Sequence, residues 1–328
     1  MKSIEMHIHS FSLRFQFKYR RDFDVFTYIA LARERGFTGV NISANGPGYR
    51  DLGGMTPQHF ANVRACLREH EMACEIDTSD TRVDNLHQML LVASQLGAER
   101  LRVYTKYQAS LAEQMEWTVR DLRAVAPEAE RLGITIVFEN HEDFQGAVIA
   151  NILAQVNHPR IKALYDYGNS QMVGEDPMDA LRAMQPHIDA VHVKDHVILN
   201  SEGRMWVQGV PMGQGLLPVM EQTEALYAGG LRRFCFENVW GYVARFKADT
   251  LPASAPFSQK HSHGFLNGAL LPEPEALEQE WQAFESSWQW YQRALASQGF
   301  VIERSEAAES PIGCGQNAGP RPAPKMPL

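Results

Sequence analysis

Cysteine, long apolar runs and targeting signals are all scarce in this chain. Its 328 residues include only four cysteines, Cys66, Cys74, Cys235 and Cys314, and none of them form a CxxC pair. So low a count favours a reduced, cytoplasmic compartment. No apolar run approaches the roughly 18 residues of a membrane span. The opening stretch MKSIEMHIHS interrupts each apolar run with a charge or a histidine, so we do not expect it to act as a signal peptide.

An excess of positive charge is also lacking. The net charge is −8 and the isoelectric point is about 5.9, so the composition predicts neither a nucleic-acid partner nor a membrane-surface partner. A Gly-rich phosphate loop is missing as well, because the first apolar run continues into HSFSLRFQF. This absence disfavours an open, doubly wound dinucleotide-binding sheet. With 45% hydrophobic and 21% charged residues, the chain has the composition of a soluble globular enzyme.

Short apolar runs alternate with longer amphipathic stretches along the chain. The candidate strands are SIEMHIHS, FTGVNIS, MACEIDT, RLRVYTK, ITIVFEN, IKALYDY, DAVHVKD and RFCFENV. Helices are expected at about 24–35, 56–71, 83–97, 110–132, 145–157, 176–187, 215–229 and 275–298, with glycines near their ends. Strict alternation of eight such units predicts a (β/α)8 TIM barrel, which we expect as a single domain over residues 1–300.

Three segments do not fit this repeat. Residues 198–214 are expected to form a hairpin or a loop after the seventh strand, and residues 241–274 a long loop that serves as a lid or as a partner-docking surface. Residues 301–328 are rich in proline and glycine and lack an apolar period, so we expect a flexible tail.

Four polar residues end apolar runs where strands are expected to stop. They are Glu139, Asp166, His192 and Glu237. Each of them alone could simply cap its strand or pair with a basic neighbour. In a closed barrel, however, the ends of consecutive strands converge, and three carboxylates with one imidazole form a hard, mainly oxygen site. The pattern therefore predicts one bound divalent metal ion, with Mn²⁺ preferred and Mg²⁺ or Co²⁺ as alternatives.

These residues lie in stretches that carry a family resemblance. The stretches are FEN at 138–140, YDYGN at 165–169, HVKD at 192–195, VPMGQG at 210–215 and FEN at 236–238. Over about residues 1–300 the chain resembles the xylose isomerase-like barrels of the sugar phosphate isomerase/epimerase group. In that family the matching residues bind one divalent metal, which implies the same role for Glu139, Asp166, His192 and Glu237.

Two positions depart from the usual pattern of this family. Asn169 stands three residues after Asp166, where family isomerases and epimerases usually carry a histidine. This difference counts against a simple epimerase and against the related three-zinc DNA-repair endonuclease. His141 follows two residues after Glu139, so strand alternation points it toward the same site. Its imidazole is suited to general base catalysis, although it could instead hydrogen-bond a backbone carbonyl of the following loop.

The sequence Glu139-Asn140-His141, together with Asn169, resembles the α subunit of C-glycoside deglycosidases. Those enzymes cleave the carbon–carbon bond between the sugar and the aromatic aglycone of 3-oxo-C-glycosides. The resemblance implies a metal-dependent lyase with His141 as its base. It also implies a small β-rich partner subunit in a hetero-oligomer.

Two other functions remain open at this point. A sugar isomerase or epimerase would use Glu139 and Glu237 as an acid/base pair on opposite faces of a free ketose. A scaffold or sugar-binding subunit would use the metal only for stability.

Several neighbouring polar and aromatic residues are candidates for binding a sugar-derived substrate. The predicted contacts are His9, Asn140, Asn169, Lys194, His196 and Trp240. For His9, packing inside the barrel is the alternative. For Trp240 and the other loop aromatics, stacking on an aglycone and packing in the core are equally compatible with the sequence.

Overall fold

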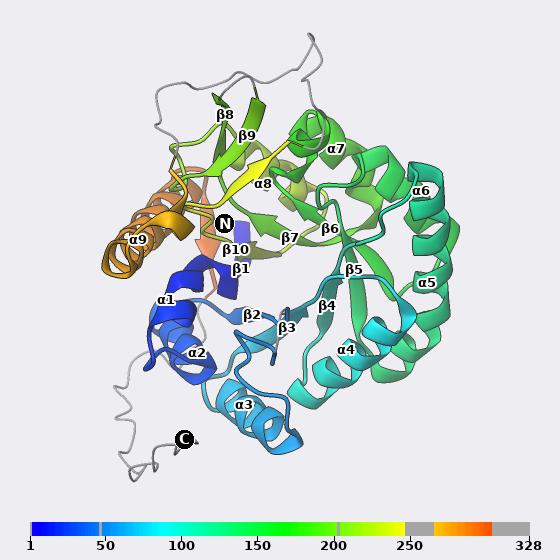
Figure 1. Cartoon of the computed structure of the whole chain (residues 1–328), viewed down its shortest axis with the longest axis horizontal. Helices are drawn as coiled ribbons and strands as arrows, with labels where there is room; N and C mark the ends of the chain where they lie inside the picture. The colour runs from blue at the N-terminus through cyan, green and yellow to red at the C-terminus, as the bar shows by residue number, and fades with distance from the viewer. Residues whose placement is uncertain (1, 46–47, 202–203, 247–265, 304–328) are drawn as a thin grey trace, which may run out of the picture.

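Within residues 2–45, 48–201, 204–246 and 266–303, which the computed structural model describes, eight parallel strands close into a barrel (Figure 1). They are β1 (Lys2–His9), β2 (Gly39–Ser43), β3 (Ala73–Asp77), β4 (Arg100–Val103), β5 (Thr135–Glu139), β6 (Ile161–Asp166), β7 (Ile188–Val193) and β10 (Arg233–Phe236). Each strand pairs with the next, and β10 pairs with β1 to close the ring. The predicted (β/α)8 barrel is confirmed.

Helices cover the outside of this barrel (Figure 1). The main ones are α2 (Val25–Glu34), α3 (Pro57–Glu69), α4 (Val83–Leu96), α5 (Leu111–Leu132), α6 (Gly146–Val156), α7 (Pro177–Met184), α8 (Val219–Ala228) and α9 (Glu273–Ser297). Their ends follow local chemistry: the Thr56 hydroxyl accepts the backbone N–H of His59 at the start of α3, and Gly97 ends α4 in the left-handed conformation.

The expected start of α8 at residue 215 is wrong, because Asp195 holds the preceding residues in a loop. Its buried carboxylate accepts the backbone N–H groups of Gly213, Gly215 and Leu217 at 2.9, 2.9 and 3.3 Å. These bonds fix residues 213–217 as a turn, so the helix begins only at Val219. These contacts occupy both oxygens of the Asp195 carboxylate.

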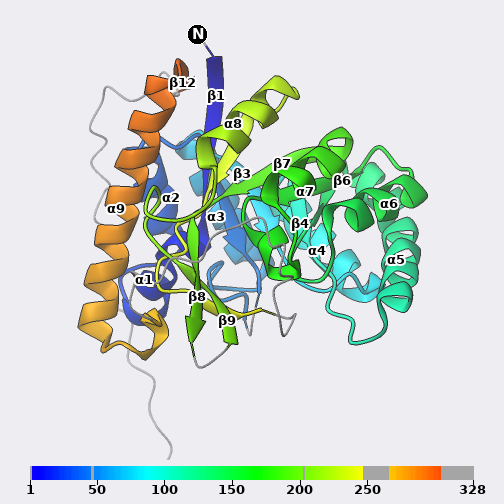
Figure 2. The ribbon, with the colours of Figure 1, turned by 90° about the horizontal axis from the view of Figure 1, so that it is seen from above.

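Further elements decorate the barrel. After β1 the chain forms a 3-10 helix, η1 (Ser10–Leu13), and α1 (Arg14–Tyr19). The expected hairpin at 198–214 is confirmed as β8 (His196–Ser201) and β9 (Arg204–Gly209), which pair antiparallel. The later strand β11 (Val243–Arg245) pairs antiparallel with the other side of β9. Figure 2 shows β8 and β9 at the end of the molecule opposite to the N-terminus. The remaining elements are η2 (Asn169–Val173), η3 (Gln185–His187), η4 (Gly268–Leu270) and β12 (Phe300–Ile302), which pairs with β1.

The interior of the barrel is apolar on one side and polar on the other. Val137, Leu164 and Ala190 pack together between β5, β6 and β7. On the opposite side the buried Glu75 carboxylate lies 3.3 Å from Arg100 Nη1 and 3.4 Å from His7 Nδ1. These ion pairs compensate the desolvation of Glu75 and form a layer beneath the open mouth of the barrel.

Some predictions concern parts of the chain outside the described residues. These parts are most of the expected 241–274 loop, with His261 and His263, and nearly all of the expected tail, with Cys314. The boundary of the single domain at residue 300 stays a prediction. In the described part of the chain, no helix combines the length and the apolar character needed to cross a membrane.

Candidate active site

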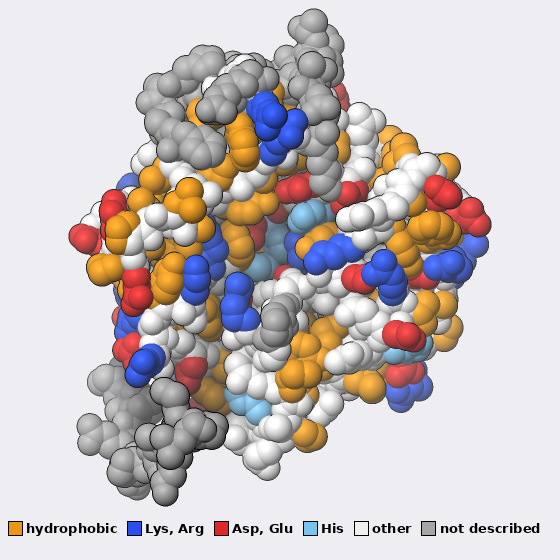
Figure 3. Space-filling model, viewed as in Figure 1, with side chains coloured by type: hydrophobic (Ala, Val, Ile, Leu, Met, Phe, Trp, Pro, Cys, Tyr) orange, Lys and Arg blue, Asp and Glu red, His pale blue; other side chains and the backbone are white. Residues whose placement is uncertain are grey.

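A cavity of about 330 Å³ opens at the carboxyl ends of the barrel strands. In the space-filling view it appears as a central hollow with histidine and acidic side chains at its floor and basic side chains around it (Figure 3). Side chains from six barrel strands line it, namely His9, Ser43, Asp77, Arg102, Glu139 and Asp166, and Glu237 joins them from just after β10. The strand ends that the sequence predicted to converge therefore do meet at one cavity.

The four predicted metal ligands lie on β5, β6, β7 and just after β10, and all are buried. Asp166 and His192 are register partners on adjacent strands. His192 Nδ1 lies 3.9 Å from Glu139 Oε1 and 3.9 Å from Asp166 Oδ2. Among the described residues, two overlapping groups have the spacing to hold a metal ion: Glu139, Asp166 and His192, and His9, His192 and Glu237. His192 belongs to both groups.

One ring nitrogen of His9 is engaged by the backbone, whereas the engaged nitrogen of His192 faces a side-chain amide. Its Nδ1 accepts the backbone N–H of Phe11 at 2.9 Å, so the ring proton is on Nε2, which faces Asp77 Oδ2 at 3.5 Å. Burial lowers the pKa of His9, but Asp77 and Glu237 outweigh burial and the net shift is upward. His9 therefore caps the turn after β1 and faces the site as a hydrogen-bond donor.

His192 has the state that a metal ligand requires. Its Nδ1 is buried and has no hydrogen-bond partner among the described residues, while its Nε2 lies 3.4 Å from the Asn41 side-chain amide. Burial, with the nearby His9 and Arg102, holds the pKa of His192 well below its usual range, so the ring is neutral. An orphaned buried nitrogen that faces two carboxylates fits a divalent cation.

Arg102, on β4, lies between two acids of this site. Its guanidinium contacts Glu139 Oε2 through Nη2 and Asp77 Oδ2 through Nη1, the latter at 3.1 Å. Burial raises the pKa of Glu139 and Arg102 opposes that rise. One oxygen of Glu139 is therefore committed to Arg102, and only Oε1 faces His192.

Lys194 and Asn169 form a second set of contacts around the ligands. The Lys194 ammonium lies 2.9 Å from Asp166 Oδ1 and donates to Asn169 Oδ1 at 2.6 Å. Asn169 in turn donates through Nδ2 to Glu139 Oε1 at 3.2 Å. The residue that replaces the family's usual histidine thus connects the lysine to the carboxylate of Glu139.

His141 lines the same cavity and is partly buried. Its ring stacks on that of Tyr104, with centroids 3.8 Å apart and planes inclined by 7°. The Arg102 guanidinium lies 4.7 Å from the centroid of Tyr104. The stack fixes the plane of the imidazole at the edge of the cavity, on the side that alternation along β5 predicted.

The predicted substrate contacts divide into two groups. His9, Asn169 and Lys194 line the cavity. Asn140 does not line it: its Oδ1 accepts the backbone N–H of Asp166 at 2.7 Å and its Nδ2 donates to the Asp166 carbonyl at 3.2 Å. Asn140 thus holds the end of β6, which carries Asp166, and the expectation that it binds substrate is corrected.

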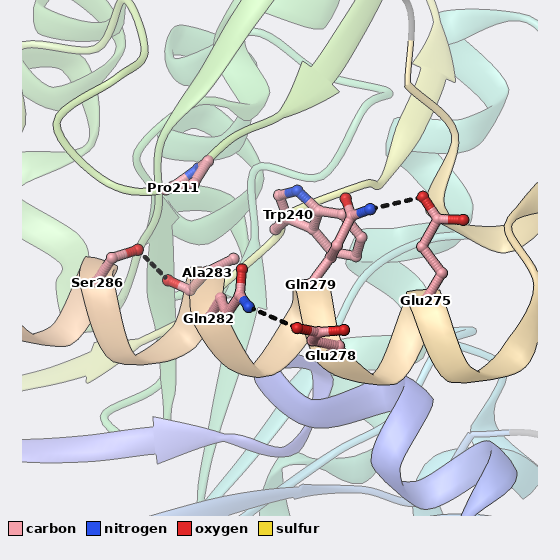
Figure 4. Close-up of a pocket in the computed structure, with 8 residues that line it drawn as sticks. All are labelled: Pro211, Trp240, Glu275, Glu278, Gln279, Gln282, Ala283 and Ser286. Atoms are coloured by element: carbon pink, nitrogen blue, oxygen red, sulfur yellow. Dashed lines mark hydrogen bonds between the residues drawn. The ribbon is translucent and has the colours of Figure 1, made fainter.

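His196 and Trp240 are also placed outside the cavity. The buried His196 ring bonds Gln171 through Nε2, and burial lowers the pKa of His196 to about 3. Trp240 is buried beside Phe15 and lines a separate groove along α9 with Gln279 and Ala283, as Figure 4 shows. His196 instead lines a small neighbouring pocket together with Asn169 and Lys194. Substrate binding by His196 and Trp240 stays a prediction.

Asp77, Arg102, Tyr104 and Lys106 line the cavity but were not among the predicted site residues. Asp77 could have been found, because it ends the run ACEID in the same way as the four ligands end theirs. The alternation Arg100, Arg102, Tyr104 on one strand also pointed these side chains to one face.

The fold and the site together define a (β/α)8 barrel with an oxygen-rich, imidazole-containing centre at its carboxyl-end mouth. The chain belongs to the xylose isomerase-like TIM barrel family, whose model matches residues 29–255. The resemblance read from the FEN, YDYGN and HVKD stretches is thereby confirmed at the level of the family.

Known proteins are similar to this chain in sequence or in fold. The Escherichia coli K12 protein YihM, described as uncharacterised, is 24% identical over 216 residues; the match spans 66% of this chain and 66% of YihM, just under two thirds of its length. The IolI protein, solved with a zinc atom, is 12% identical to this chain with a TM-score of 0.63. The match covers 90% of this chain and 99% of the IolI chain. D-psicose 3-epimerase from Clostridium cellulolyticum H10, solved with D-tagatose, is 14% identical with a TM-score of 0.62 and covers 88% and 99%. At these identities the two solved structures establish likeness of fold alone.

Proposed function

We propose that this protein is a divalent-metal-dependent lyase that removes a proton next to the ketone of an oxidised sugar conjugate, with His141 as the base. The substrate class that the ENH sequence favours is the 3-oxo-C-glycosides. The observation that carries the proposal is the state of Glu139: one oxygen contacts Arg102 and the other accepts from Asn169. His141 faces the same cavity from the stack with Tyr104.

Glu139, Asp166, His192 and Glu237 would hold the metal ion. The orphaned Nδ1 of His192 and the two carboxylates that face it, Glu139 and Asp166, support this assignment, and Glu237 lies within ligand spacing of His192 as well. An ion bound there would supply Lewis-acid stabilisation of the negative charge that develops on the ketone oxygen. Mn²⁺ is our preferred candidate because the donor set is mainly oxygen, and the zinc in the IolI structure is in keeping with a divalent ion on this fold.

His141 would take the proton from the carbon next to the ketone. The electron pair left on that carbon forms a carbon–carbon double bond to the neighbouring anomeric carbon, while the anomeric bond to the aglycone breaks. The aglycone leaves with the electron pair of the broken bond and receives one proton, which the His141 imidazolium can return. No oxidant or reductant is consumed. Lys194, fixed by Asp166 and Asn169, places a donor for substrate hydroxyls at the cavity wall.

A sugar isomerase or epimerase is the second candidate. Glu139 and Glu237 both line the cavity, on β5 and after β10, and D-psicose 3-epimerase shares the fold. Such an enzyme would need a free oxygen of Glu139 to take the proton, whereas one oxygen contacts Arg102 and the other accepts from Asn169. Incubation with D-fructose and D-psicose in D₂O distinguishes the two, because only an isomerase or epimerase would incorporate deuterium next to the carbonyl of a free ketose.

The principal test is replacement of the base. We expect His141→Ala to lower the rate of cleavage of a 3-oxo-C-glucoside by roughly 10²- to 10⁴-fold, the usual contribution of general base catalysis. Metal content, measured by atomic emission, should stay unchanged. His87→Ala, at an exposed position on α4, is the matched control and should keep full activity.

Two results would refute this function. One is cleavage at the wild-type rate by His141→Ala. The other is deuterium incorporation into a free ketose by a protein that leaves every 3-oxo-glycoside intact, which would instead establish the isomerase or epimerase.

A further inference from the structure

Positive charge is in excess on one side of the cavity. The acidic side chains that would hold the metal come from β5, β6 and the end of β10, where Lys194 pairs with Asp166. On the β2–β4 side Arg102 pairs with Asp77, and Arg50 and Lys106 are further basic side chains. Figure 3 shows basic side chains beside the central hollow. Because a bound divalent cation would offset the acids, the β2–β4 side would be left with the uncompensated positive charge.

Arg50 is held so that part of its guanidinium is available. Its Nε donates to Asp51 Oδ1 at 2.6 Å, and the buried Asp51 is itself fixed by the Ser10 hydroxyl at 2.7 Å. In the part of the chain that the structure describes, no acceptor meets the two terminal NH₂ groups of Arg50. Its side chain is 50% exposed and lines the cavity. A guanidinium anchored in this way presents a planar pair of donors, the geometry that binds carboxylate and phosphate oxygens.

Lys106 is the second available cation. It follows β4, is exposed, and lines the cavity with its ammonium 5.8 Å from the centroid of Tyr104. None of the described carboxylates pairs with it. The Tyr104 ring also stacks on His141.

The inner cations of the cavity are already engaged. Arg102 contacts Glu139 and Asp77, and Lys194 pairs with Asp166. An anion on the substrate would therefore meet Arg50 and Lys106 at the rim before any other positive charge.

We propose that Arg50 and Lys106 form a subsite for an anionic oxyacid group, a carboxylate or a phosphate, carried by the substrate. The assignment rests on the proposed function, because that function places the ketone on the opposite, acidic side of the cavity. A volume of about 330 Å³ is near the lower end of the roughly 300–1,000 Å³ of small-molecule sites. A cavity of this size accommodates the sugar unit of the proposed substrate, whose ketone and anionic group would face opposite sides.

Calorimetric binding to the full chain in buffer with Mn²⁺ tests the subsite with two matched pairs of probes. D-fructose 6-phosphate is compared with D-fructose, and D-glucuronate with D-glucose. We expect the anionic member of at least one pair to bind at least tenfold more tightly than its neutral partner, and this preference to shrink as NaCl is raised. Lys106→Met and Arg50→Met should each reduce the preference about tenfold. Lys162→Met, on β6 at the closed end of the barrel, is the matched control and should retain it.

The two pairs also identify the source of the anion: a preference confined to the phosphate indicates a sugar phosphate, and one confined to the carboxylate indicates a sugar acid. Equal binding within both pairs, failure of both anions to bind, or a preference that persists in both variants overturns the subsite. Lys106→Met keeps the test valid if loss of the Arg50–Asp51 bond impairs folding. Cleavage of a neutral 3-oxo-C-glucoside that depends on His141, without any anion preference, would refute the subsite alone. Anion preference without any cleavage would refute the lyase alone.

Discussion

The guanidinium of Arg102 contacts two carboxylates that are both almost fully buried. Asp77 and Glu139 are 2% and 1% exposed, and Arg102 is 9% exposed. Burial alone would lower the pKa of Arg102, but Glu139 and Asp77 outweigh burial, so its pKa is raised and it stays charged. At the scale of single residues, Arg102 therefore supplies a buried positive charge that both acids contact.

We expect Arg102→Met to lower the free energy of unfolding by about 3–5 kcal/mol, because it leaves two buried carboxylates without their cation. Urea denaturation in EDTA measures this loss. Arg68→Met, on an exposed face of α3, serves as the control and should change stability by less than about 0.5 kcal/mol. Adding Asp77→Asn to Arg102→Met should recover part of the loss. Equal stability of the Arg102 and Arg68 variants would contradict this account.

At the scale of elements, α9 fixes the segment that follows β1. The buried Glu280 of α9 accepts the backbone N–H groups of Phe15 and Gln16 at 2.9 and 3.1 Å, which lie in the first turn of α1. Burial raises the pKa of Glu280 to about 7, against the opposing effect of Arg14. Because Phe11 and its neighbours lead from β1 past the cavity, this carboxylate supports one wall of the site from a helix far along the chain.

Glu280 gives stability a defined dependence on pH. Its folded pKa is raised above that of an exposed glutamate, so its contribution is fully present below about pH 4.5 and is lost as pH rises through about 7. Between pH 5 and 8 the wild type should lose about 2 kcal/mol more than Glu280→Gln. Urea unfolding at both pH values provides the measurement, with the exposed Glu278→Gln on the same helix as control. Parallel losses in all three proteins would rule out this role of Glu280.

At the scale of the whole molecule, metal binding depends on the fold. The predicted metal ligands come from four barrel strands or from the residues that follow them, so an ion would bind only when the barrel is closed. A ligand that binds only the folded state stabilises that state by mass action. The small β-rich partner subunit stays a prediction, as does the role of residues 241–274.

Mn²⁺ at about 100 times its dissociation constant should stabilise the protein by about 2.7 kcal/mol and raise its melting temperature by roughly 5 °C relative to EDTA. Differential scanning calorimetry measures the shift. Asp166→Asn should show little or none of it, whereas Asp84→Asn, exposed on α4, should show all of it. A melting temperature that does not change with Mn²⁺ would contradict the binding of this metal at the predicted site.

The fold was predictable because the residues that mark each strand and each helix end lie close together in the sequence. Apolar runs, capping residues such as Thr56 and glycines such as Gly97 mark strands and helix ends within a few neighbours. The start of α8 was misplaced because the bonds that delay it come from Asp195, which lies outside the helix and its immediate neighbours.

The site was predictable where one residue ended one strand, as for Glu139 and Asp166. It was not predictable where a role depends on contacts between strands. Asn140 follows Glu139 directly, yet its amide bonds the backbone of β6, and His196 follows the ligand strand, yet it is buried against Gln171. The pairing of Arg102 with Asp77 and Glu139 likewise joins three strands.

Closure of the barrel between β1 and β10 has a consequence for how the chain folds. The partners Glu5 and Arg233, joined by an ion pair, are 228 positions apart. During synthesis β1 therefore lacks its β10 partner until most of the barrel has been made. Contacts of such long range carry a high entropic cost of closure and slow the final step. Because Glu237 directly follows β10, the last metal ligand takes its place in the same event that seals the ring.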